Sequence, residues 1–448
     1  MKKIYLFAII YFTTFYANAQ FGGPEIVDNT ITSTIVNIIT ADLNNDGKKD
    51  IITSHYQNQI NWYNNSGGTF SSEQSITESM SHPYHLDVGD ANGDDFIDIL
   101  ATDDNGNNSK VLLFLNIAGG TSWNQVVIDS AIQVAAFKSF FADVDNDGDS
   151  DIITNTDLEI TMYLNSGMGN FSSRIVIANT NEFYSITLND FNNDDFKDFA
   201  VHSAHGLQLY LNSTDTSFFL ANTIDPGLNG FLTSVDIDND NDMDIISGTN
   251  LLLGYTTFKN DGTGVFSYFE ATHYYCGDSQ NAPFVNTQLN NDTFEDALYI
   301  PNTNLKLFWK QNNGSGNLLN PLSIDDTYQY LNVCADDIDN DQDNDIIWYG
   351  INSGVRYLGI IKNNNPVLGL KHEESEYILK IIPNPASRSF CIQPDINLYE
   401  INIHNTFGQL ILASKDKDVN ISDLTKGIYF VTVTSVENDK ITLKLIKE

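Results

Sequence analysis

An acidic unit of nine residues recurs seven times between residues 42 and 345. It reads Asp-x-Asn/Asp-x-Asp-x-x-x-Asp and is followed by a short apolar run. The copies begin at residues 42, 90, 143, 190, 236, 288 and 337, so successive starts lie 46 to 53 residues apart. A period of this length, with strand and turn patterns and no helical periodicity, is typical of one four-stranded antiparallel sheet per repeat. The sequence therefore predicts an all-β fold, a seven-bladed β-propeller over residues 20–363.

Each predicted blade has four strands, which we name a to d in chain order. Strand a precedes the acidic loop, and most residues four and six positions before each loop are apolar, a period of two that suits a sheet packed between other sheets. Strand b follows the loop, strand c ends in a turn rich in Asn and Gly, and strand d leads to the next repeat. The residues that precede the first acidic loop match the c–d turn and strand d of the other repeats, so the first repeat begins in its middle. We therefore expect Glu25–Asp28 to be the outer strand of the seventh blade and to close the ring.

The acidic loops predict calcium sites. Oxygens of side chains at positions 1, 3, 5 and 9 and the backbone carbonyl at position 7 can surround one cation, and calcium takes six to eight such oxygens. Position 6 must turn sharply, which favours residues that tolerate a left-handed backbone. The predicted ligand residues are Asp42, Asn44, Asp46, Lys48, Asp50, Asp90, Asn92, Asp94, Phe96, Asp98, Asp143, Asp145, Asp147, Asp149, Asp151, Asp190, Asn192, Asp194, Phe196, Asp198, Asp236, Asp238, Asp240, Asp242, Asp244, Asp337, Asp339, Asp341, Asp343 and Asp345.

The copy at residues 288–296 is decayed, because position 1 is Gln288 and position 6 is Thr293. We expect it to bind calcium weakly or not at all, through Asn290, Asp292 and Asp296. The whole chain is then expected to bind about five to seven Ca²⁺ ions. Two other interpretations fit less well. An EF-hand requires Glu at position 12, which no copy has. Ordinary Asp/Asn/Gly turns would explain a single copy, but they do not explain why six near-intact copies keep the same spacing.

The charge of the chain agrees with metal loops. It has 22 Lys+Arg and 59 Asp+Glu, a net charge of −37, and 29 of the acidic residues lie in the seven loops. Such a charge argues against nucleic acid as a partner and against docking on anionic lipid. A hydrophobic content of 41% is enough to build large cores, so the chain is not a disordered acidic tail.

The first 19 residues are expected to be a secretory signal peptide. Lys2 and Lys3 precede the apolar run Ile4–Tyr16, and Ala17-Asn18-Ala19 fits the small-x-small cleavage pattern. The run is too short to span a bilayer, and no other stretch approaches 18 apolar residues, so we expect no transmembrane segment.

Residues 364–376 are expected to be a linker and residues 377–448 a second domain. Only three cysteines are present, too few for a disulfide framework. A Cys276–Cys334 bridge and a free, buried Cys334 both remain open.

The repeat resembles the FG-GAP/VCBS repeat of integrin-type propellers, through its Asp-x-Asp-x-Asp-Gly-x-x-Asp loop, over about residues 21–370. The resemblance implies a calcium-bearing extracellular propeller, often found in adhesion or glycan-related proteins, without fixing one activity. The C-terminal part resembles the type A sorting domain of the type IX secretion system, through Ile381–Pro385, Ile401–Gln409 and Gly427–Val431. That resemblance implies an immunoglobulin-like β-sandwich, recognition by the type IX machinery, and a secreted, extracellular or outer-surface location.

Antiparallel strands place the acidic loops and the c–d turns on one face of the propeller, and the d–a and b–c connections on the other. We call these the loop face and the second face. Loops on a scaffold commonly carry binding function, and the second face is predicted to gather the histidines and several tyrosines. The candidate ligand residues are His55, Tyr56, His82, Tyr84, His85, Tyr184, His202, His205, Tyr274 and Tyr275. An alternative is that these are ordinary loop residues.

The favoured function is an adhesion or recognition module for glycans or surface proteins, working as a monomer. The alternative is a polysaccharide lyase or hydrolase that uses His and Tyr on the second face, where catalysis would need a base within hydrogen-bond reach of the proton it abstracts. The sequence has no nucleophile elbow and no HExxH motif, and His202-x-x-His205 is a weak signal by itself. A third interpretation is a spacer with no ligand of its own.

Overall fold

The computed structural model describes residues 20–447 with the exception of residues 78, 180–184, 214–215, 226, 228–229, 250–253, 273–283, 291, 302–303, 365–379, 394–397, 406–409 and 436–439. The described residues form 35 β-strands and no helix. Accordingly, no helix in this part of the chain could cross a membrane. The chain divides into two compact units, one up to Pro366 and one from Val367 onward. The predicted signal peptide lies outside the described residues.

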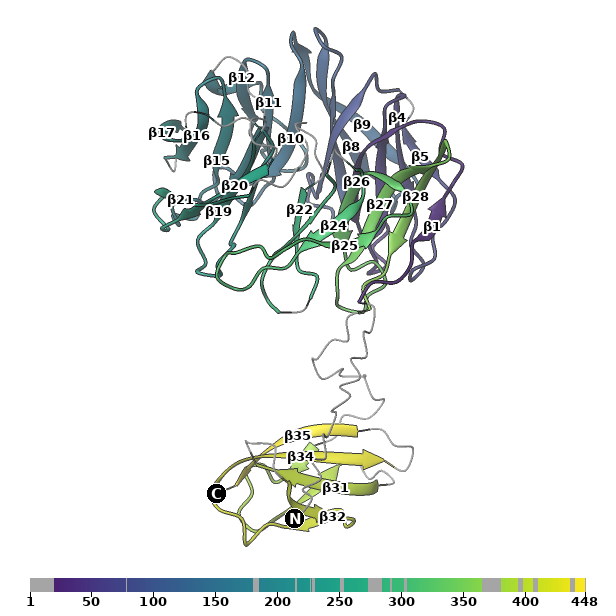
Figure 1. Ribbon diagram of the computed structural model, residues 1–448, viewed down its shortest axis with the longest axis vertical. Helices are drawn as coiled ribbons and strands as arrows, with labels where there is room; N and C mark the ends of the chain where they lie inside the picture. The colour runs from purple at the N-terminus through teal and green to yellow at the C-terminus, as the bar shows by residue number, and fades with distance from the viewer. Residues whose placement is uncertain are drawn as a thin grey trace, which may run out of the picture. The chain divides into compact units, whose positions relative to one another are not determined.

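Seven four-stranded antiparallel sheets make up the first unit, as predicted (Figure 1). Blades 1 to 3 consist of β2 (Ile35–Ala41), β3 (Asp50–His55), β4 (Gln59–Tyr63) and β5 (Gln74–Thr77); β6 (Pro83–Gly89), β7 (Asp98–Asp103), β8 (Ser109–Asn116) and β9 (Trp123–Ile132); and β10 (Ala136–Ala142), β11 (Asp151–Thr156), β12 (Glu159–Tyr163) and β13 (Ile175–Asn179).

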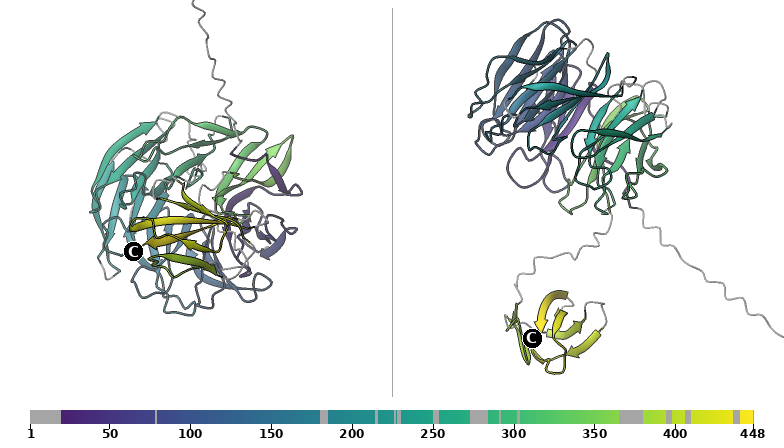
Figure 2. Two further views of the ribbon diagram at one scale, coloured as in Figure 1. Left: turned by 90° about the horizontal axis from the view of Figure 1, so that it is seen from below. Right: turned by 90° about the vertical axis from the view of Figure 1, so that its left-hand side faces the viewer.

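Blades 4 to 6 consist of β14 (Ser185–Asn189), β15 (Asp198–Ser203), β16 (Gly206–Asn212) and β17 (Phe218–Asp225); β18 (Leu232–Val235), β19 (Asp244–Thr249), β20 (Gly254–Asn260) and β21 (Phe266–Thr272); and β22 (Phe284–Thr287), β23 (Asp296–Tyr299), β24 (Leu307–Lys310) and β25 (Leu322–Asp325). Blade 7 consists of β26 (Gln329–Asp336), β27 (Asp345–Asn352), β28 (Val355–Ile361) and β1 (Glu25–Asp28). The left view of Figure 2 shows the blades standing around a common axis.

The N-terminal strand closes the ring, which confirms the predicted role of Glu25–Asp28. β1 pairs antiparallel with β28, and Glu25 lies opposite Ile360. The chain joins blade 7 before β1 begins, because the Gly22 N–H donates to the Lys362 carbonyl at 2.7 Å. With β1 in place, the seventh sheet has all four strands, and its ladder of hydrogen bonds is complete where the two ends of the propeller chain meet.

Each seam between neighbouring blades has its own apolar cluster, and seven such clusters surround the axis. The apolar column four residues before each loop is confirmed: six of its seven members are buried, and Phe284 is half-buried. The residue six positions before each loop was also predicted to be buried. This prediction is wrong in four blades, where the residue one position earlier is buried instead. The displaced pairs are Ile35 for Val36, Pro83 for Tyr84, Ala136 for Phe137 and Tyr330 for Leu331.

A β-bulge explains the displaced column. Pro83 pairs with Asp103 and His85 with Thr102, so the register of the ladder shifts at Tyr84. The same skip occurs at Val36, Phe137 and Leu331. A bulge inserts one extra residue and turns its side chain out of the alternation. The bulged residues therefore leave the seams near the second face.

The second unit contains two sheets that share one core, as expected for a small β-sandwich. The three-stranded sheet has β29 (Lys380–Ile382), β30 (Ser389–Gln393) and β33 (Asp418–Asn420), and the four-stranded sheet has β32 (Leu410–Ser414), β31 (Leu398–His404), β34 (Gly427–Ser435) and β35 (Lys440–Lys447). Phe390 from one sheet and Ile401 and Val431 from the other are buried in the common core.

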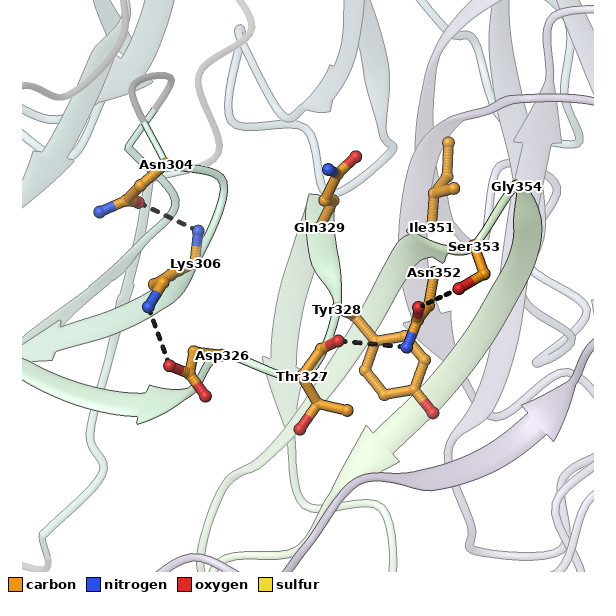
Figure 3. A pocket seen from close by; sticks show the side chains of 10 residues that line it. All are labelled: Asn304, Lys306, Asp326, Thr327, Tyr328, Gln329, Ile351, Asn352, Ser353 and Gly354. Carbon is orange, nitrogen blue, oxygen red and sulfur yellow. Dashed lines mark hydrogen bonds and ion pairs between the residues drawn. The ribbon is translucent and has the colours of Figure 1, made fainter.

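The two propeller faces differ in their connections. The acidic loops and c–d turns lie together on the loop face, since each of them follows a strand that runs in the same direction. On the second face, turns of blades 6 and 7 border a cavity of about 400 Å³ (Figure 3). Cys334 and Cys391 are free cysteines, and burial raises the pKa of the Cys334 thiol; Cys276 lies outside the described residues.

Candidate functional site

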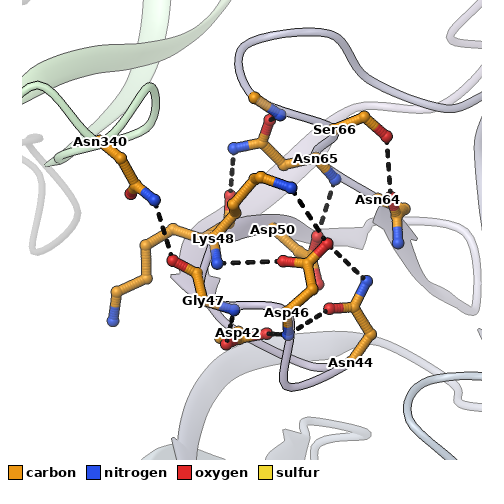
Figure 4. A network of polar contacts seen from close by, with 12 residues as sticks. Asp42, Asn44, Asp46, Gly47, Lys48, Asp50, Asn64, Asn65, Ser66 and Asn340 are labelled. Atoms are coloured by element: carbon orange, nitrogen blue, oxygen red, sulfur yellow. Dashed lines mark hydrogen bonds and ion pairs between the residues drawn. The ribbon is translucent and has the colours of Figure 1, made fainter. Parts of the chain in front are cut away.

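The Asp at position 1 organises the acidic loop. In loop 42–50, the Asp42 carboxylate accepts hydrogen bonds from the N–H groups of Asp46 and Gly47 at 3.1 and 2.7 Å (Figure 4). The same two bonds recur at Asp90, Asp190, Asp236 and Asp337, and the second recurs at Asp143. Backbone donors thus orient the first predicted ligand of each of these loops.

Position 5 repeats a second interaction in all seven loops. Its carboxylate accepts the N–H of position 7 at 2.9 to 3.2 Å, as in the bond from Lys48 to Asp46. The loops therefore share one backbone conformation whether position 7 is Lys, Phe or Asp.

The left-handed turn predicted at position 6 is confirmed in every loop. Gly47, Asp95, Gly148, Asp195, Asn241, Thr293 and Gln342 all have φ between 68° and 93°. A second left-handed position, which was not predicted from the sequence, is position 4. It is Asn45, Gly93, Asn146, Asn193, Asn239 and Asn340, with φ between 57° and 74°. The recurrence of Asn there was the available signal, because Asn tolerates this conformation better than most residues.

Position 9 ties the loop to the end of strand c. Asp50 is fully buried and accepts N–H groups from Leu43 at 3.1 Å and from Asn65 at 2.7 Å. All seven position-9 carboxylates make this pair of bonds. Burial raises the pKa of Asp50, Asp98 and Asp151 to about 6 and that of Asp198, Asp244, Asp296 and Asp345 to about 7. A nearby cation would offset the cost of ionising them.

A ring of asparagines links the blades, a role that was not predicted from the sequence. The Asn that starts each c–d turn donates from Nδ2 to the position-2 carbonyl of the preceding blade. In blade 2, Asn116 donates to Leu43 at 2.8 Å; in blade 1, Asn65 donates to Ile338 of blade 7 and so crosses the closing seam. The other members are Asn165, Asn212, Asn260, Asn312 and Asn363. Seven such bonds form a closed circuit next to the acidic loops.

The residue at position 3 divides the loops into two kinds. Where it is Asn, its Nδ2 donates to the position-5 carboxylate, as Asn92 does to Asp94 and Asn192 to Asp194, both at 3.0 Å. Where it is Asp, three carboxylates gather with ligand oxygens within 4.8 Å of one another. These clusters are Asp143, Asp145 and Asp151; Asp236, Asp238 and Asp244; and Asp337, Asp339 and Asp345.

The Asp-rich loops contain buried oxygens that have no hydrogen-bond partner among the described residues. They are Oδ1 of Asp143, Asp145, Asp238 and Asp339, and both side-chain oxygens of Asp343. Burial, with Asp341 alongside, raises the pKa of Asp343 to about 8. Leaving a charged oxygen buried and unpaired is costly. A hard divalent cation is the partner that such oxygen sets suit, so these residues fit calcium.

Lysines compensate part of the charge in two of these loops. Lys259 Nζ lies 2.8 Å from Asp238 Oδ2, and Lys362 Nζ lies 3.2 Å from Asp339 Oδ2. The equivalent residue beside loop 143–151, immediately before the ring asparagine Asn165, is Leu164. Loop 143–151 therefore has two unpartnered buried oxygens and no lysine at this position, which makes it the strongest candidate metal site.

The decayed loop keeps the shape of the others. With its side-chain oxygen turned toward the backbone, Gln288 accepts the N–H groups of Asp292 and Thr293, as Asp does at position 1. Asn290 donates to Asp292 at 2.8 Å, as in the Asn-type loops. The amide of Gln288 thus preserves the fold of this loop with less charge than its neighbours have.

The predicted second-face residues are placed differently from one another. His55 and His202 are buried, 2% and 0% exposed, and burial lowers the pKa of each to about 4. His202 lies 2.9 Å from the Gly230 carbonyl and 3.1 Å from the Ser247 hydroxyl. His85 packs on Phe140, and burial lowers its pKa to about 3.

Three other predicted residues form an aromatic row. Tyr56 is 58% exposed and its ring centroid lies 4.4 Å from that of His82, which in turn lies 6.0 Å from Tyr84. Tyr84 then contacts Phe137, which the prediction did not include. His205 is exposed. Tyr184, Tyr274 and Tyr275 lie outside the described residues.

Comparison with family models identifies both parts of the chain. Residues 42–101, 143–201 and 288–348 match the FG-GAP-like repeat, and residues 380–448 match the secretion system C-terminal sorting domain. No curated protein matches the chain.

Solved structures support the propeller fold. One concerns specific recognition of non-reducing terminal N-acetylglucosamine by an Agrocybe aegerita lectin; it is 16% identical, with a TM-score of 0.51, and the match covers 66% of this chain and 81% of that one. The other two are complexes of BBS1N with ARL6DN soaked with lead or mercury, 11% and 10% identical, with TM-scores of 0.54 and 0.51. Each match covers 78% of this chain and 98% of that one. At such identity, these likenesses concern the fold alone.

Proposed function

The chain carries FG-GAP-like repeats on a β-propeller and a sorting domain that directs export by type IX secretion to the cell surface or extracellular space, and from this premise we propose that it is a calcium-stabilised recognition module for glycans or surface proteins. The propeller is the scaffold, calcium fixes its loop face, and the second face binds the partner. The sorting domain is the part that the secretion machinery recognises.

The observation that carries the calcium proposal is the set of buried carboxylate oxygens without partners in the Asp-type loops. In loop 143–151, Asp143, Asp145 and Asp151 would hold the ion. Bound calcium would neutralise carboxylates that otherwise repel one another by roughly 1 kcal/mol per pair or more. At ten times its dissociation constant, calcium stabilises the fold by about 1.4 kcal/mol for each site.

Recognition by the second face is supported by the contrast between its residues and those of the loop face. The loops repeat one arrangement seven times, whereas the second face has the aromatic row of Tyr56, His82 and Tyr84 and the cavity between blades 6 and 7. Binding residues commonly lie on connections held by a rigid scaffold. The Agrocybe aegerita lectin, which is similar in fold, recognises non-reducing terminal N-acetylglucosamine.

Two measurements test the proposal with the mature chain, residues 20–448. Elemental analysis after dialysis against calcium should find at least three bound Ca²⁺ per chain; fewer would overturn the calcium part. Incubation with a panel of polysaccharides and with whole cells should show retention without new reducing ends. New reducing ends would point to the alternative enzyme, and no retention on either surface would favour a spacer.

A further inference from the structure

Blades 6 and 7 border an open cavity on the second face that no predicted ligand residue lines. Its volume is about 400 Å³, within the range of small-molecule sites. Three separate segments contribute: the b–c turn of blade 6, with Asn304 and Lys306; the link between the blades, residues 326–329; and the b–c turn of blade 7, residues 351–354 (Figure 3). A site assembled from three segments of a closed ring is held in place by the seam beneath it.

An aromatic ring is fixed at this cavity. Tyr328 is half-buried, and its ring centroid lies 4.6 Å from that of Trp348 and 5.1 Å from that of Tyr357. The Tyr330 ring centroid also lies 6.1 Å away. Packing on three neighbours immobilises the ring, so a ligand that contacts its part at the cavity does not have to order it first. A rigid ring with a hydroxyl group offers both apolar contact and a hydrogen bond.

Amide and hydroxyl groups surround the ring. Asn352 Nδ2 donates to the Thr327 carbonyl at 3.2 Å and so bridges two of the segments, while Ser353 donates to Asn352 Oδ1 at 3.0 Å. Gln329 is exposed at the cavity, and its side chain has no hydrogen-bond partner among the described residues. Its amide can both donate to a ligand and accept from one.

The cavity is neutral on a strongly acidic chain. Its only ionic side chains are Lys306 and Asp326, which pair at 2.8 Å, while the chain as a whole carries −37. A cationic ligand would find more charge on the loop face, and an anion would be repelled by the surrounding field. An uncharged ligand with many hydroxyl groups suits this lining best.

We propose that this cavity binds one uncharged hexose or N-acetylhexosamine unit of a glycan, stacked on Tyr328 and hydrogen-bonded by Gln329 and Asn352. This inference rests on the proposed recognition function and names its binding site and ligand class. Trp348 is buried behind the cavity and packs on Tyr328, so a sugar that stacks on Tyr328 should change the fluorescence of Trp348 indirectly and report occupancy.

The test uses the calcium-loaded mature chain and a panel of free neutral hexoses and N-acetylhexosamines, with glucuronic acid as the charged comparison. Tryptophan fluorescence and saturation-transfer NMR are read for the wild type and for Tyr328→Ala and Gln329→Ala. Gln329→Ala removes an exposed side chain without partners, so it keeps the test valid even if Tyr328→Ala fails to fold. Tyr268→Ala, at a tyrosine on β21 that is 64% exposed, is the matched control.

The expected result is binding of at least one neutral sugar, weakened tenfold or more by both cavity substitutions and unchanged by Tyr268→Ala. If a sugar binds equally well to Gln329→Ala and Tyr328→Ala, the cavity assignment is wrong while glycan recognition stands. If glucuronic acid binds more tightly than every neutral sugar, the assigned ligand class is wrong. If no sugar binds although calcium does, both this inference and the glycan part of the proposed function fail.

Discussion

The two faces of the propeller differ in how far their residues and contacts repeat from blade to blade. On the loop face, seven copies of one loop repeat the same bonds at positions 5 and 9, and seven asparagines join each blade to the one before. On the second face, the connections vary: Tyr56 and His82 of blades 1 and 2 contact each other, and blades 6 and 7 border the cavity of Figure 3. The loop face therefore stabilises the scaffold, and the second face is where a specific ligand would bind. Substitutions on the loop face should therefore change stability, and substitutions of exposed residues on the second face should change binding.

Calcium removal should have the largest effect. The three Asp-type loops alone would lose about 4 kcal/mol if each site contributes about 1.4 kcal/mol, and the freed carboxylates would repel one another. We expect EGTA to lower the Tm by about 6 °C or more in scanning calorimetry. Excess magnesium is the control and should restore little, because Mg²⁺ prefers to keep its waters. An unchanged Tm in EGTA would mean that the loops are turns and not metal sites.

Acidity should modulate that effect. Burial raises the pKa of the position-9 carboxylates to about 6 or 7, above the value near 4 of an unfolded Asp. Without calcium, their contribution to stability is full below about pH 4 and is lost as the pH rises through 6 to 7. Calcium compensates the ionised form, so the increase in Tm that calcium causes should be larger at pH 7.5 than at pH 5. The buried histidines affect the Tm equally with and without calcium, so their contribution cancels when the two conditions are compared. A shift independent of pH would contradict the assignment of position 9.

The asparagine ring should come next. Asn165 is 3% exposed, and its Nδ2 donates to the carbonyls of Ala91 and Ser150 at 2.8 and 3.1 Å. Asn165→Ala leaves these buried carbonyls without a donor and should cost about 2–3 kcal/mol of unfolding free energy. Asn170→Ala, at an exposed position in the same turn, is the matched control and should cost less than about 0.5 kcal/mol. Equal losses would mean that the ring does not join the blades.

The sequence was most informative where it repeats. The period, the blade count, the closing strand and the turn at position 6 all followed from seven copies of one pattern, and the structure confirms them. The bulge at Tyr84 was not predicted, because an extra residue in a strand leaves the composition unchanged and alters only the pairing. The asparagine ring was visible as a recurring residue, but its partner lies about 70 residues away on the preceding blade. The cavity at Tyr328 was not predicted, because its lining residues do not belong to the repeated sequence pattern.

Exchanging the residue at position 3 should have opposite effects in the two kinds of loop. Asp145→Asn supplies an amide to an oxygen cluster and removes one charge, so the calcium-free chain should gain about 1 kcal/mol while calcium affinity at that loop falls roughly tenfold. Asn92→Asp should do the reverse, because it removes the bond to Asp94. Calorimetric titration of each variant beside the wild type measures both. Changes of the same sign in the two loops would contradict the division by position 3.

The smallest effect on stability should come from an exposed residue of the second face, His205, in contrast to the nearby buried His202. His205→Ala removes an exposed side chain and should change the unfolding free energy by less than about 0.5 kcal/mol. His202→Ala removes a fully buried ring that contacts Gly230 and Ser247 and should cost about 2–4 kcal/mol. Urea unfolding of both variants, in calcium, measures the difference. A large loss from His205→Ala would show that exposed residues of the second face also stabilise the scaffold. Because the His202 ring is fully buried against Gly230 and Ser247, the His202-x-x-His205 pair presents only the His205 ring at the surface.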